Sequence, residues 1–365
     1  MGNVRCVNCD RGYPESGVPY LCPHCNGIFD YSSLPTFTKH LVEDQLPGIW
    51  RFRQFFDLFD NAPIVTLGEG NTPLVWDECC GKKIGYKLES LNPTGSYKDR
   101  GTAVLVSQLL ARGVRLAVED SSGNAGASFA AYAARTGLTA EIYVPEKASG
   151  PKRDQIIAFG ANLICVPGPR SAAAAAVLER ASKGVAYASH AYLPFGMGGI
   201  ASIAYELWEE LGDFSGSVVA PVGHGSLLLG IIRGFQSLLA GGYLTKMPFF
   251  VGVQADKCAP VYQTSVTDTD VIQEVEEGET LAEGVRVRNP IRGISLIKEV
   301  KAFEGAFVAV EEKLLVESYK ELGLRGVYVE PTSALVWGAV KELYERLPEP
   351  IILIMSGSGL KNRTV

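Results

Sequence analysis

Residues 92–101 have the sequence NPTGSYKDRG, in which a polar, glycine-containing turn ends in a lysine. An apolar run at Ile84–Leu88 precedes the turn, and helix-favouring residues follow it over Thr102–Arg112. Lys98 is therefore expected in the first turn of a helix, where the positive end of the helix dipole lowers the pKa of an ammonium group. A lysine that attacks a carbonyl as the neutral amine benefits from this position. Taken alone, the pattern also fits a solvated lysine at a helix start.

Short apolar segments alternate with helical segments on both sides of this turn. The segments typical of buried strands are Leu116–Val118, Ala140–Val144, Asn162–Val166, Val218–Val222, Phe249–Val253 and Ile351–Met355. Helical patterns lie between several of them, as at Ala125–Thr136 and Ser171–Ser182. Uninterrupted Val/Ile-rich strands separated by helices predict parallel sheets that are covered on both faces. The length of 365 residues is sufficient for two α/β domains of this kind.

The overall composition excludes several functional classes. The chain is 47% hydrophobic and 20% charged, with a formal net charge of −6, whereas a protein that coats nucleic acid needs a basic face. The longest stretch without charged residues, Gly184–Tyr205, contains a proline and four glycines and is not typical of a membrane span. The N-terminus lacks the apolar segment of a secretory signal. We therefore expect a cytoplasmic protein with neither nucleic-acid nor membrane partners.

Four of the eight cysteines lie in two CxxC pairs, Cys6 with Cys9 and Cys22 with Cys25. Each pair can direct two thiolates at one tetrahedral ion, and the twelve residues between the pairs suit a short hairpin. The segment has little to bury besides Tyr13, Tyr20 and Leu21, so a structural Zn²⁺ would supply folding free energy. His24 is expected to be a neighbour of this shell, since four thiolates complete it. A ribbon that has lost its metal or is oxidised to disulfides is the alternative.

Three further motifs follow predicted strands, where ligands bind in open parallel sheets. In DSSGNAG at 120–126, the backbone amides at the helix start can hold a carboxylate and Asn124 can bind a phenolic oxygen. In PVGHGSL at 221–227, a glycine-rich loop can direct several amides at one phosphate. In SGSGLK at 356–361, the Ser356 hydroxyl can meet a ring nitrogen. Each motif alone is also compatible with an ordinary turn or helix cap.

Together these motifs resemble the fold-type II pyridoxal-phosphate enzymes, the tryptophan synthase β superfamily, and most closely the threonine synthases. LGEGNTPL at 67–74, NPTGSYKDRG, the Arg288-Asn-Pro tripeptide and EPTSA at 330–334 are similar to segments of that family. The similarity extends from about Ile64 to Asn362 in the same order, and a cysteine-pair N-terminus occurs in threonine-synthase-like proteins. The resemblance implies two parallel-sheet α/β domains with a small N-terminal zinc ribbon.

On this basis we expect four regions. Residues 1–30 are expected to form the zinc-ribbon-like segment, and residues 31–66 a helical linker with one or two helices in the aromatic stretch from Asp30 to Asn61. The large cofactor-binding domain is expected to combine residues 67–97 with 201–365, and the small α/β domain to span residues 98–200. The acidic segment Thr267–Gly284 is expected to be an exposed insertion.

The resemblance also implies a role for each motif. Lys98 would bind pyridoxal phosphate covalently and move protons, Asn124 would hold the 3′ oxygen of the ring, and Ser356 would face the pyridine nitrogen. The amides of Gly223, His224, Gly225, Ser226 and Leu227 would bind the cofactor phosphate. The loop of Ser121, Ser122, Gly123 and Ala125 would take the α-carboxylate of the substrate. Cys6, Cys9, Cys22 and Cys25 would hold Zn²⁺.

The implied activity is that of a lyase of amino-acid biosynthesis, a threonine-synthase-like enzyme that converts O-phosphohomoserine to threonine and is expected to be a homodimer. A serine next to the ring nitrogen does not favour the pyridinium form, which directs chemistry towards elimination and replacement. Threonine synthases bind the substrate with Asn and Arg in a segment that matches Ala188–Met197. Here that segment contains His190, which also fits a structural role in a glycine-rich loop, and no Lys or Arg occurs between Lys183 and Arg233.

Three arginines, Arg153, Arg288 and Arg292, are possible substitutes for the missing cation. The alternatives are a serine/threonine dehydratase or a cysteine- or cysteate-synthase-like β-replacement enzyme. A non-catalytic relative, in which the cofactor stabilises the fold and the zinc ribbon docks a partner, is the alternative from another class. The joint presence of Lys98, Asn124 and the glycine loop favours an enzyme.

Overall fold

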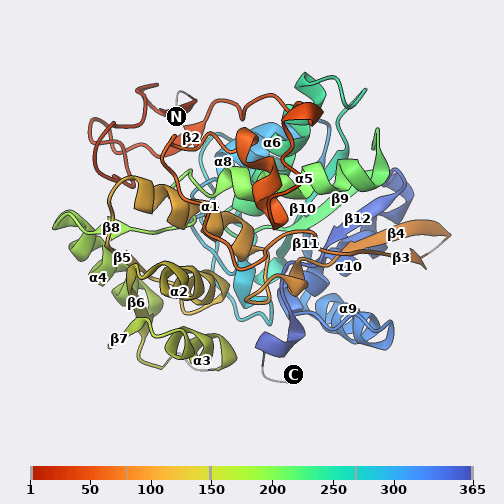
Figure 1. Ribbon diagram of the computed structural model, residues 1–365. Helices are drawn as coiled ribbons and strands as arrows, with labels where there is room; N and C mark the ends of the chain where they lie inside the picture. Colours follow the sequence, from red (N-terminus) through yellow and green to blue (C-terminus); the bar gives the residue numbers. More distant parts are fainter. Residues whose placement is uncertain (1–2, 80, 148–149, 268, 363–365) are drawn as a thin grey trace.

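The computed structural model describes residues 3–79, 81–147, 150–267 and 269–362 (Figure 1). Its strands form three sheets of two, six and four strands. The smallest lies in the N-terminal segment, where β1 (Val4–Cys6) pairs antiparallel with β2 (Phe29–Tyr31). Among the described residues, no helix combines the length and the apolar character that a membrane span requires.

The six-stranded sheet has the strand order β11-β10-β9-β12-β4-β3. Its strands are β3 (Leu74–Cys79), β4 (Lys82–Lys87), β9 (Ser217–Pro221), β10 (Phe249–Ala255), β11 (Ala306–Val310) and β12 (Ile351–Ile354). All neighbouring strands are parallel except β3, which runs antiparallel to β4. The apolar runs predicted at 218–222, 249–253 and 351–355 are thus strands, and the prediction of parallel sheets is confirmed.

The four-stranded sheet has the order β7-β6-β5-β8 and is parallel throughout. It contains β5 (Leu116–Glu119), β6 (Thr139–Pro145), β7 (Asn162–Val166) and β8 (Ala186–Tyr187). All four strands fall inside the 98–200 region that was expected to form the small domain. The division of the chain into domains remains a prediction.

Helices cover both faces of the larger sheet, as Figure 1 shows. The helices are α1 (Lys98–Ala111), α2 (Asn124–Thr136), α3 (Pro151–Ala158), α4 (Arg170–Ser182), α5 (Met197–Leu211), α6 (Ser226–Ala240), α7 (Pro260–Thr267), α8 (Gly293–Ala302), α9 (Glu312–Leu324) and α10 (Pro331–Leu343). Alternate residues of β9 belong to different apolar clusters: Val218 packs in the cluster that contains α6, and Val219 in the cluster that contains α10. This explains why the strand is apolar from Val218 to Pro221, on both of its faces.

The aromatic stretch from Asp30 to Asn61 forms two short 3-10 helices, η1 (Lys39–Leu41) and η2 (Gly48–Phe55), rather than α-helices. Most of its aromatic side chains are buried, and several pack against α5; the rings of Phe37 and Phe52 lie 5.0 and 5.2 Å from that of Tyr205. Gly48 has φ +53°, and a Cβ there would lie 1.9 Å from the Glu69 carbonyl oxygen. The chain therefore follows the surface of α5 instead of forming a regular amphipathic helix.

The acidic segment expected to be exposed is only partly so. Val271, Glu274, Glu276 and Glu277 are exposed, whereas Thr280 and Ala282 are buried. The segment leads from α7 to the 3-10 helix η5 (Glu283–Val285). There it packs closely against the glycine-rich loop, since a Cβ added at Gly223 would lie 3.0 Å from the Gly284 carbonyl oxygen.

Candidate active site

The topology of the six-stranded sheet brings two predicted motifs together. Strands β9 and β12 are parallel neighbours, so their carboxyl ends lie at the same edge of the sheet. The loop with Gly223–Leu227 follows β9, and Ser356 follows β12. Strand β4 is the other neighbour of β12, and its end leads through the 3-10 helix η3 (Glu89–Leu91) to Lys98. This edge is where open α/β sheets bind ligands.

Direct backbone contacts join the lysine motif to the Ser356 motif. The Tyr97 N–H donates to the Ser356 carbonyl oxygen at 3.0 Å, and the Ser358 N–H donates to the Gly95 carbonyl oxygen at 2.9 Å. The hydroxyl oxygens of Ser356 and Ser333 lie 2.9 Å apart, and both residues are buried. The start of α1 is therefore attached to the end of β12, although about 260 residues separate the two in the sequence.

The residue after Lys98 fixes the helix start. Thr94 donates to the Asp99 carboxylate through its N–H at 2.6 Å and its hydroxyl at 2.7 Å, and the Ser128 hydroxyl donates at 2.6 Å. Burial raises the pKa of Asp99 to about 6, although these hydrogen bonds favour the charged form. Side-chain bonds of this kind satisfy donors before the first turn of a helix and define where the helix begins.

The next residue, Arg100, is the centre of a buried ionic cluster. Its guanidinium contacts Glu89 and Glu206, each at 2.7 Å, and all three residues are almost completely buried. Burial alone would raise the pKa of Glu206, but Arg100 and Lys87 lower it to about 2. The family-like 67–74 motif supports the cluster, because the Asn71 N–H donates to Glu206 at 2.8 Å. The motif residues beside Lys98 thus serve to hold it in place.

The Lys98 ammonium lies in an environment that favours the neutral amine. Burial lowers the pKa of Lys98 to about 7, with opposing contributions from the carboxylates of Glu119 and Glu330 and a lowering one from Arg170. At neutral pH a substantial fraction of the protein molecules therefore carries Lys98 as the uncharged amine, which is the nucleophilic form. The residue keeps part of its surface accessible, and its Nζ lies 4.8 Å from the centre of the Tyr97 ring.

Lys98 shares a narrow cavity with residues from two other segments. The cavity has a volume of about 20 Å³ and is lined by Lys98 and Thr102 of α1, Ser226 of the glycine loop, His190 and the apolar side chains of Leu193 and Met197. The Ser226 hydroxyl donates to the His190 carbonyl oxygen at 3.4 Å. The lysine, the end of the glycine loop and the 188–197 segment therefore meet, as the sequence motifs predicted for a single site.

Asn124 is brought to the same region through Glu330, a residue to which the sequence assigned no role. The Asn124 side-chain amide donates to both Glu330 carboxylate oxygens at 3.0 Å, and its own oxygen is buried without a hydrogen-bond partner among the described residues. Glu330 also binds Lys152 at 3.2 Å, and its N–H donates to the Gly357 carbonyl oxygen at 2.9 Å. Glu330 thus links the start of α2 to the Ser356 motif.

The glycine loop has the geometry of an anion site. Gly225 has φ +98°, a left-handed conformation that favours glycine, and it directly precedes the 15-residue helix α6. Free amides and the positive end of the helix dipole attract negative charge at such a helix start. Burial lowers the pKa of His224 to about 3, and its Nδ1 is buried without a hydrogen-bond partner among the described residues. The side chain is therefore neutral.

The loop expected to take a substrate carboxylate lies at the end of the other sheet. Ser121, Ser122 and Gly123 are partly buried and Ala125 is buried, between β5 and the start of α2. The Gly123 N–H donates to the Ser121 hydroxyl at 3.2 Å. A Cβ on Gly126 would lie 1.8 Å from the Ser121 carbonyl oxygen, so this tight turn requires glycine. The carboxylate-binding role of the loop remains a prediction.

Sequence reasoning missed a second acid, Glu119. It is the last residue of β5, is 1% exposed, and has one carboxylate oxygen 3.6 Å from His190 Nδ1. Burial raises the pKa of Glu119 well above its ordinary value. The positions of the two acids in the sequence could have identified them. Glu119 ends an apolar strand and Glu330 directly precedes a helix, and side chains at these two kinds of position face a site at the end of a sheet.

The three arginines considered for an anionic substrate group have other surroundings. Arg292 pairs with Asp30 at 3.0 Å, Arg153 donates to the Cys165 sulfur at 3.3 Å, and Arg288 is exposed. The arginine whose charge lowers the pKa of Lys98 is instead Arg170, at the start of α4. Burial lowers the pKa of His190 well below its ordinary value, and the charge of Arg170 contributes to the lowering.

The four N-terminal cysteines converge as predicted. Their sulfur atoms lie within 4.8 Å of one another; Cys6 and Cys25 are 3.4 Å apart, and Cys9 and Cys22 are 3.8 Å apart. Four thiolates around one Zn²⁺ are about 3.8 Å apart, whereas a disulfide is about 2.0 Å long. The cluster can therefore hold a metal ion. His24 is exposed.

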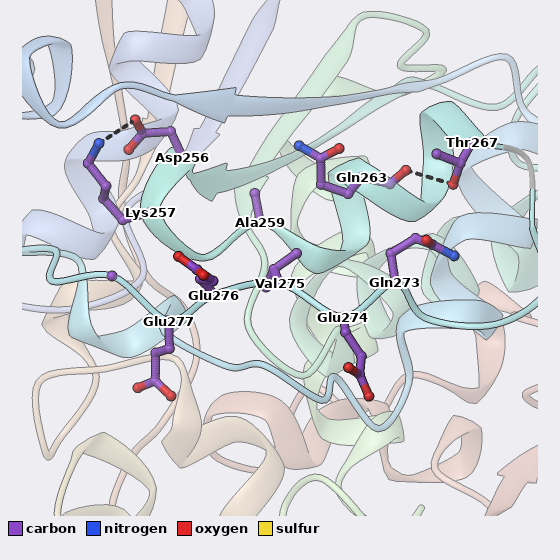
Figure 2. Close-up of a pocket in the computed structure, with 11 residues that line it drawn as sticks. Asp256, Lys257, Ala259, Gln263, Thr267, Gln273, Glu274, Val275, Glu276 and Glu277 are labelled. Carbon is purple, nitrogen blue, oxygen red and sulfur yellow. Dashed lines mark hydrogen bonds and ion pairs between the residues drawn. The ribbon is translucent and has the colours of Figure 1, made fainter.

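A much larger cavity lies elsewhere, at the carboxyl end of β10 (Figure 2). It has a volume of about 510 Å³, and its lining includes four acids and one lysine: Asp256, Glu274, Glu276, Glu277 and Lys257. Its described lining includes none of the predicted site residues. Lys257 pairs with Asp256 at 3.2 Å and offsets one of these charges.

The residues around Lys98 fit a ligand that carries an aldehyde, a phosphate and a phenolic oxygen. Lys98 offers an amine with a lowered pKa, and the loop before α6 offers amides to a phosphate. The side-chain oxygen of Asn124 is buried and has no hydrogen-bond partner among the described residues, so it is available to a polar group of a ligand. These are the features that the resemblance to pyridoxal-phosphate enzymes implies.

Comparison with known proteins agrees with this geometry. Residues 65–357 match the family model of the pyridoxal-phosphate dependent enzymes. The chain is 31% identical to a threonine synthase of Methanocaldococcus jannaschii, over 98% of this chain and 92% of that protein, and 28% identical to one of Methanosarcina acetivorans, over 99% and 93%. Among solved structures, it is similar to a threonine deaminase from T.th., with a TM-score of 0.68, 26% identity and coverage of 80% of this chain and 93% of that one.

Maize serine racemase has the same fold at 19% identity, with a TM-score of 0.69 and coverage of 79% of this chain and 88% of that one. The resemblance stated from the sequence motifs is thus confirmed. The chain belongs to the pyridoxal-phosphate-dependent enzymes of fold type II.

Proposed function

We propose that this protein is a lyase that catalyses elimination or replacement at the side chain of a small amino acid, in the manner of threonine synthases, which convert O-phosphohomoserine to threonine. The observation that carries the proposal is the environment of Lys98. This lysine, with a pKa lowered to about 7, shares a cavity with the end of the glycine loop and follows a residue bonded to the Ser356 backbone.

In this proposal pyridoxal phosphate, when bound, withdraws electrons from the α-carbon of the amino acid. Lys98 would hold the cofactor through its Nζ and move protons at that atom, and the amides of Gly223–Leu227 would hold the phosphate. Asn124 would bind the 3′ oxygen, and the loop of Ser121, Ser122, Gly123 and Ala125 would bind the substrate carboxylate. Glu330, which binds the Asn124 amide, orients that side chain.

Ser356 supports elimination and replacement over transamination. Its hydroxyl is neutral and lies 2.9 Å from that of Ser333, so Ser356 would offer an uncharged partner to the ring nitrogen. A neutral partner would not favour the pyridinium form and would limit how much charge the ring accepts.

A second candidate activity is that of a serine/threonine dehydratase. The observation that favours it is the absence of a cation from the 184–232 sequence, together with the pairing of Arg292 with Asp30. A dehydratase removes water and needs no cation for a substrate phosphate. Threonine synthase remains the first candidate because the two relatives described above that match nearly the whole chain carry that name.

The first experiment tests the lysine. Purified protein should absorb visible light, and borohydride should fix the cofactor onto Lys98, as peptide mass analysis would reveal. Lys98→Ala should lose the fixed cofactor. Lys361→Ala is the matched control, because Lys361 is also buried with a pKa lowered by burial to about 8, and this variant should retain it. A Lys98→Ala protein that keeps the covalent adduct would refute the assignment.

The second experiment compares O-phosphohomoserine, O-phosphoserine, O-acetylserine, serine and threonine as substrates. Release of phosphate and threonine from O-phosphohomoserine alone supports the threonine synthase activity. Turnover only of serine and threonine supports the dehydratase, and turnover of O-acetylserine or O-phosphoserine a β-replacement enzyme. A protein that binds the cofactor and turns over none of them supports the non-catalytic alternative.

The four-cysteine cluster is proposed to hold a structural Zn²⁺. Metal analysis should find about one zinc ion per chain, since four thiolates complete a tetrahedral shell. Cys22→Ser should lose stoichiometric zinc, and a Cys22→Ser protein with a full complement of zinc would contradict this site. Cys258→Ser is the control, because Cys258 is buried in another part of the chain.

A further inference from the structure

One carboxylate of the N-terminal ribbon, that of Asp30, is buried in the main body of the protein. Asp30 lies on β2, opposite Arg5 of β1, and its neighbour Phe29 is paired with the cysteine Cys6. The Asp30 residue is 4% exposed. Its position is thus set by the strand pair that carries one of the four clustered thiols.

Asp30 binds two buried arginines at once. The Arg233 guanidinium donates to both of its oxygens, at 2.6 and 2.8 Å, and Arg292 lies 3.0 Å away in a second ion pair. Arg292 is 0% and Arg233 6% exposed. Among the described residues Asp30 is the carboxylate that both arginines contact, so its displacement would leave two buried positive charges unpaired.

Both arginines are connected to the glycine loop. The Arg292 N–H donates to the His224 carbonyl oxygen at 3.0 Å, and a Cβ on Gly225 would lie 3.2 Å from the Arg292 carbonyl oxygen. Arg233 lies on α6, the helix that starts at Ser226. The Asp30 carboxylate is therefore connected to the glycine loop by two routes. One is the contact between the Arg292 backbone and the loop backbone, and the other is α6, the helix that follows the loop.

The same arginine and the ribbon also contact the segment that lines the Lys98 cavity. The Arg292 side chain donates to the Tyr192 carbonyl oxygen at 3.0 Å. The ribbon ring of Tyr20 lies 5.4 Å from that of Tyr192, and the ring of Tyr13 lies 5.1 Å from that of Phe195. Ribbon, glycine loop and cavity wall thus form one packed unit.

We propose that Asp30 and Arg292 are positioning residues that couple the four-cysteine ribbon to the glycine loop, so that metal bound by the ribbon strengthens binding of the cofactor phosphate. The proposal rests on the proposed function, since it takes the glycine loop as the phosphate site. Folding of the ribbon around a metal holds β2 and hence the Asp30 carboxylate in place. The carboxylate in turn holds the backbone of Arg292 against the loop.

The test measures pyridoxal-phosphate affinity with and without metal, by visible absorbance of the cofactor-free wild-type chain. Metal is removed with a strong chelator in the presence of a phosphine reductant, and its loss is checked by elemental analysis. We expect metal removal to raise the Kd for pyridoxal phosphate about tenfold or more, within the usual range of coupling between two sites. The coupling must be reciprocal, so bound pyridoxal phosphate should raise the zinc affinity by the same factor.

The Asp30→Asn variant distinguishes a specific coupling between the ribbon metal and the cofactor site from a general destabilisation of the protein. In this variant metal removal should change the Kd for pyridoxal phosphate less than about twofold, because the connection is already broken. Asp10→Asn is the matched control: Asp10 pairs with Arg5 in the same ribbon but on its exposed surface, and this variant should keep the full metal dependence. If Asp30→Asn does not fold, the reciprocal measurement on the wild-type chain decides alone.

The outcomes separate this inference from the proposed function. A wild-type chain that binds pyridoxal phosphate equally well with and without metal overturns the coupling and leaves the proposed function intact. A metal-loaded wild-type chain that does not bind pyridoxal phosphate overturns both. An Asp30→Asn protein with undiminished metal dependence also overturns the role of Asp30.

Discussion

Two cavities lie beyond the carboxyl ends of neighbouring strands of one sheet, and they differ in nearly every property. The cavity beside Asp256, after β10, has a volume of about 510 Å³ and an acidic lining (Figure 2). The cavity beside Lys98, near the end of β9, has a volume of about 20 Å³ and contains a lysine, a histidine and the start of a long helix. The smaller cavity is the one that we propose carries the chemistry. Volume alone therefore does not distinguish the proposed site from the other cavity.

The difference follows from what comes after each strand. After β9 the chain makes a glycine turn and enters the 15-residue helix α6, so amides and a helix dipole favour an anion. After β10 it makes a single 3-10 turn, η4 (Asp256–Cys258), and then the eight-residue helix α7. The carboxylates of Glu274, Glu276 and Glu277 oppose binding of a phosphate there.

The largest expected effect concerns Lys98. Lys98→Ala should lower turnover of whichever substrate the enzyme accepts by a factor on the order of 10³ or more, because it removes the proposed nucleophile. The double variant Glu276→Gln/Glu277→Gln in the larger cavity is the comparison. Steady-state kinetics of both proteins would test the contrast, and a loss of similar size in the acidic-cavity variant would break it.

The second effect concerns the ionic cluster that holds the start of α1. Arg100→Met leaves the Glu89 carboxylate buried without its cation and leaves Glu206 with Lys87 as its remaining ion-pair partner, so the free energy of unfolding should fall by about 3–5 kcal/mol. Lys257→Met breaks the partly exposed ion pair in the acidic cavity and should cost less than about 1 kcal/mol. Urea unfolding monitored by circular dichroism measures both. Equal losses of unfolding free energy in the two variants would contradict the expected difference between the buried ionic cluster and the partly exposed ion pair.

The third effect is on pH dependence. Since the pKa of Lys98 is lowered to about 7, the neutral amine is the minor form at pH 6 and the major form at pH 8. The rate at which cofactor-free protein captures pyridoxal phosphate should therefore rise about tenfold between pH 6 and pH 8, with a midpoint near 7. Stopped-flow absorbance would follow the capture. A midpoint near 10 would indicate a solvated lysine instead.

The smallest effect is expected from the acidic cavity. Glu276→Gln/Glu277→Gln should change the Kd for pyridoxal phosphate by less than about twofold, because Debye screening limits the reach of exposed charges.

Glu330→Gln is the contrasting variant. It removes a carboxylate that raises the pKa of Lys98, so the capture midpoint should move to lower pH by up to about one unit. An unchanged midpoint would separate Glu330 from the lysine.

Much of the fold could be predicted from local patterns. The apolar run at 351–355 corresponds to β12, the run at 218–222 to β9, and the turn at 92–97 leads into a helix that begins at Lys98. The aromatic stretch after the ribbon could not be predicted in the same way. Its rings are placed by contact with Tyr205 of α5, a partner far away in the sequence, and so the segment needs no helical period of its own.

The candidate site shows the same division. Glycine turns, a lysine at a helix start and paired cysteines have requirements that lie within a few residues, so the sequence alone determined where those groups occur and which chemistry each can perform. Glu330 beside Asn124 and Asp30 beside Arg292 are pairs joined across 206 and 262 positions. Only the tertiary structure decided these contacts, because buried charges are matched by packing in space, and a local sequence pattern carries no information about which distant partner each will meet.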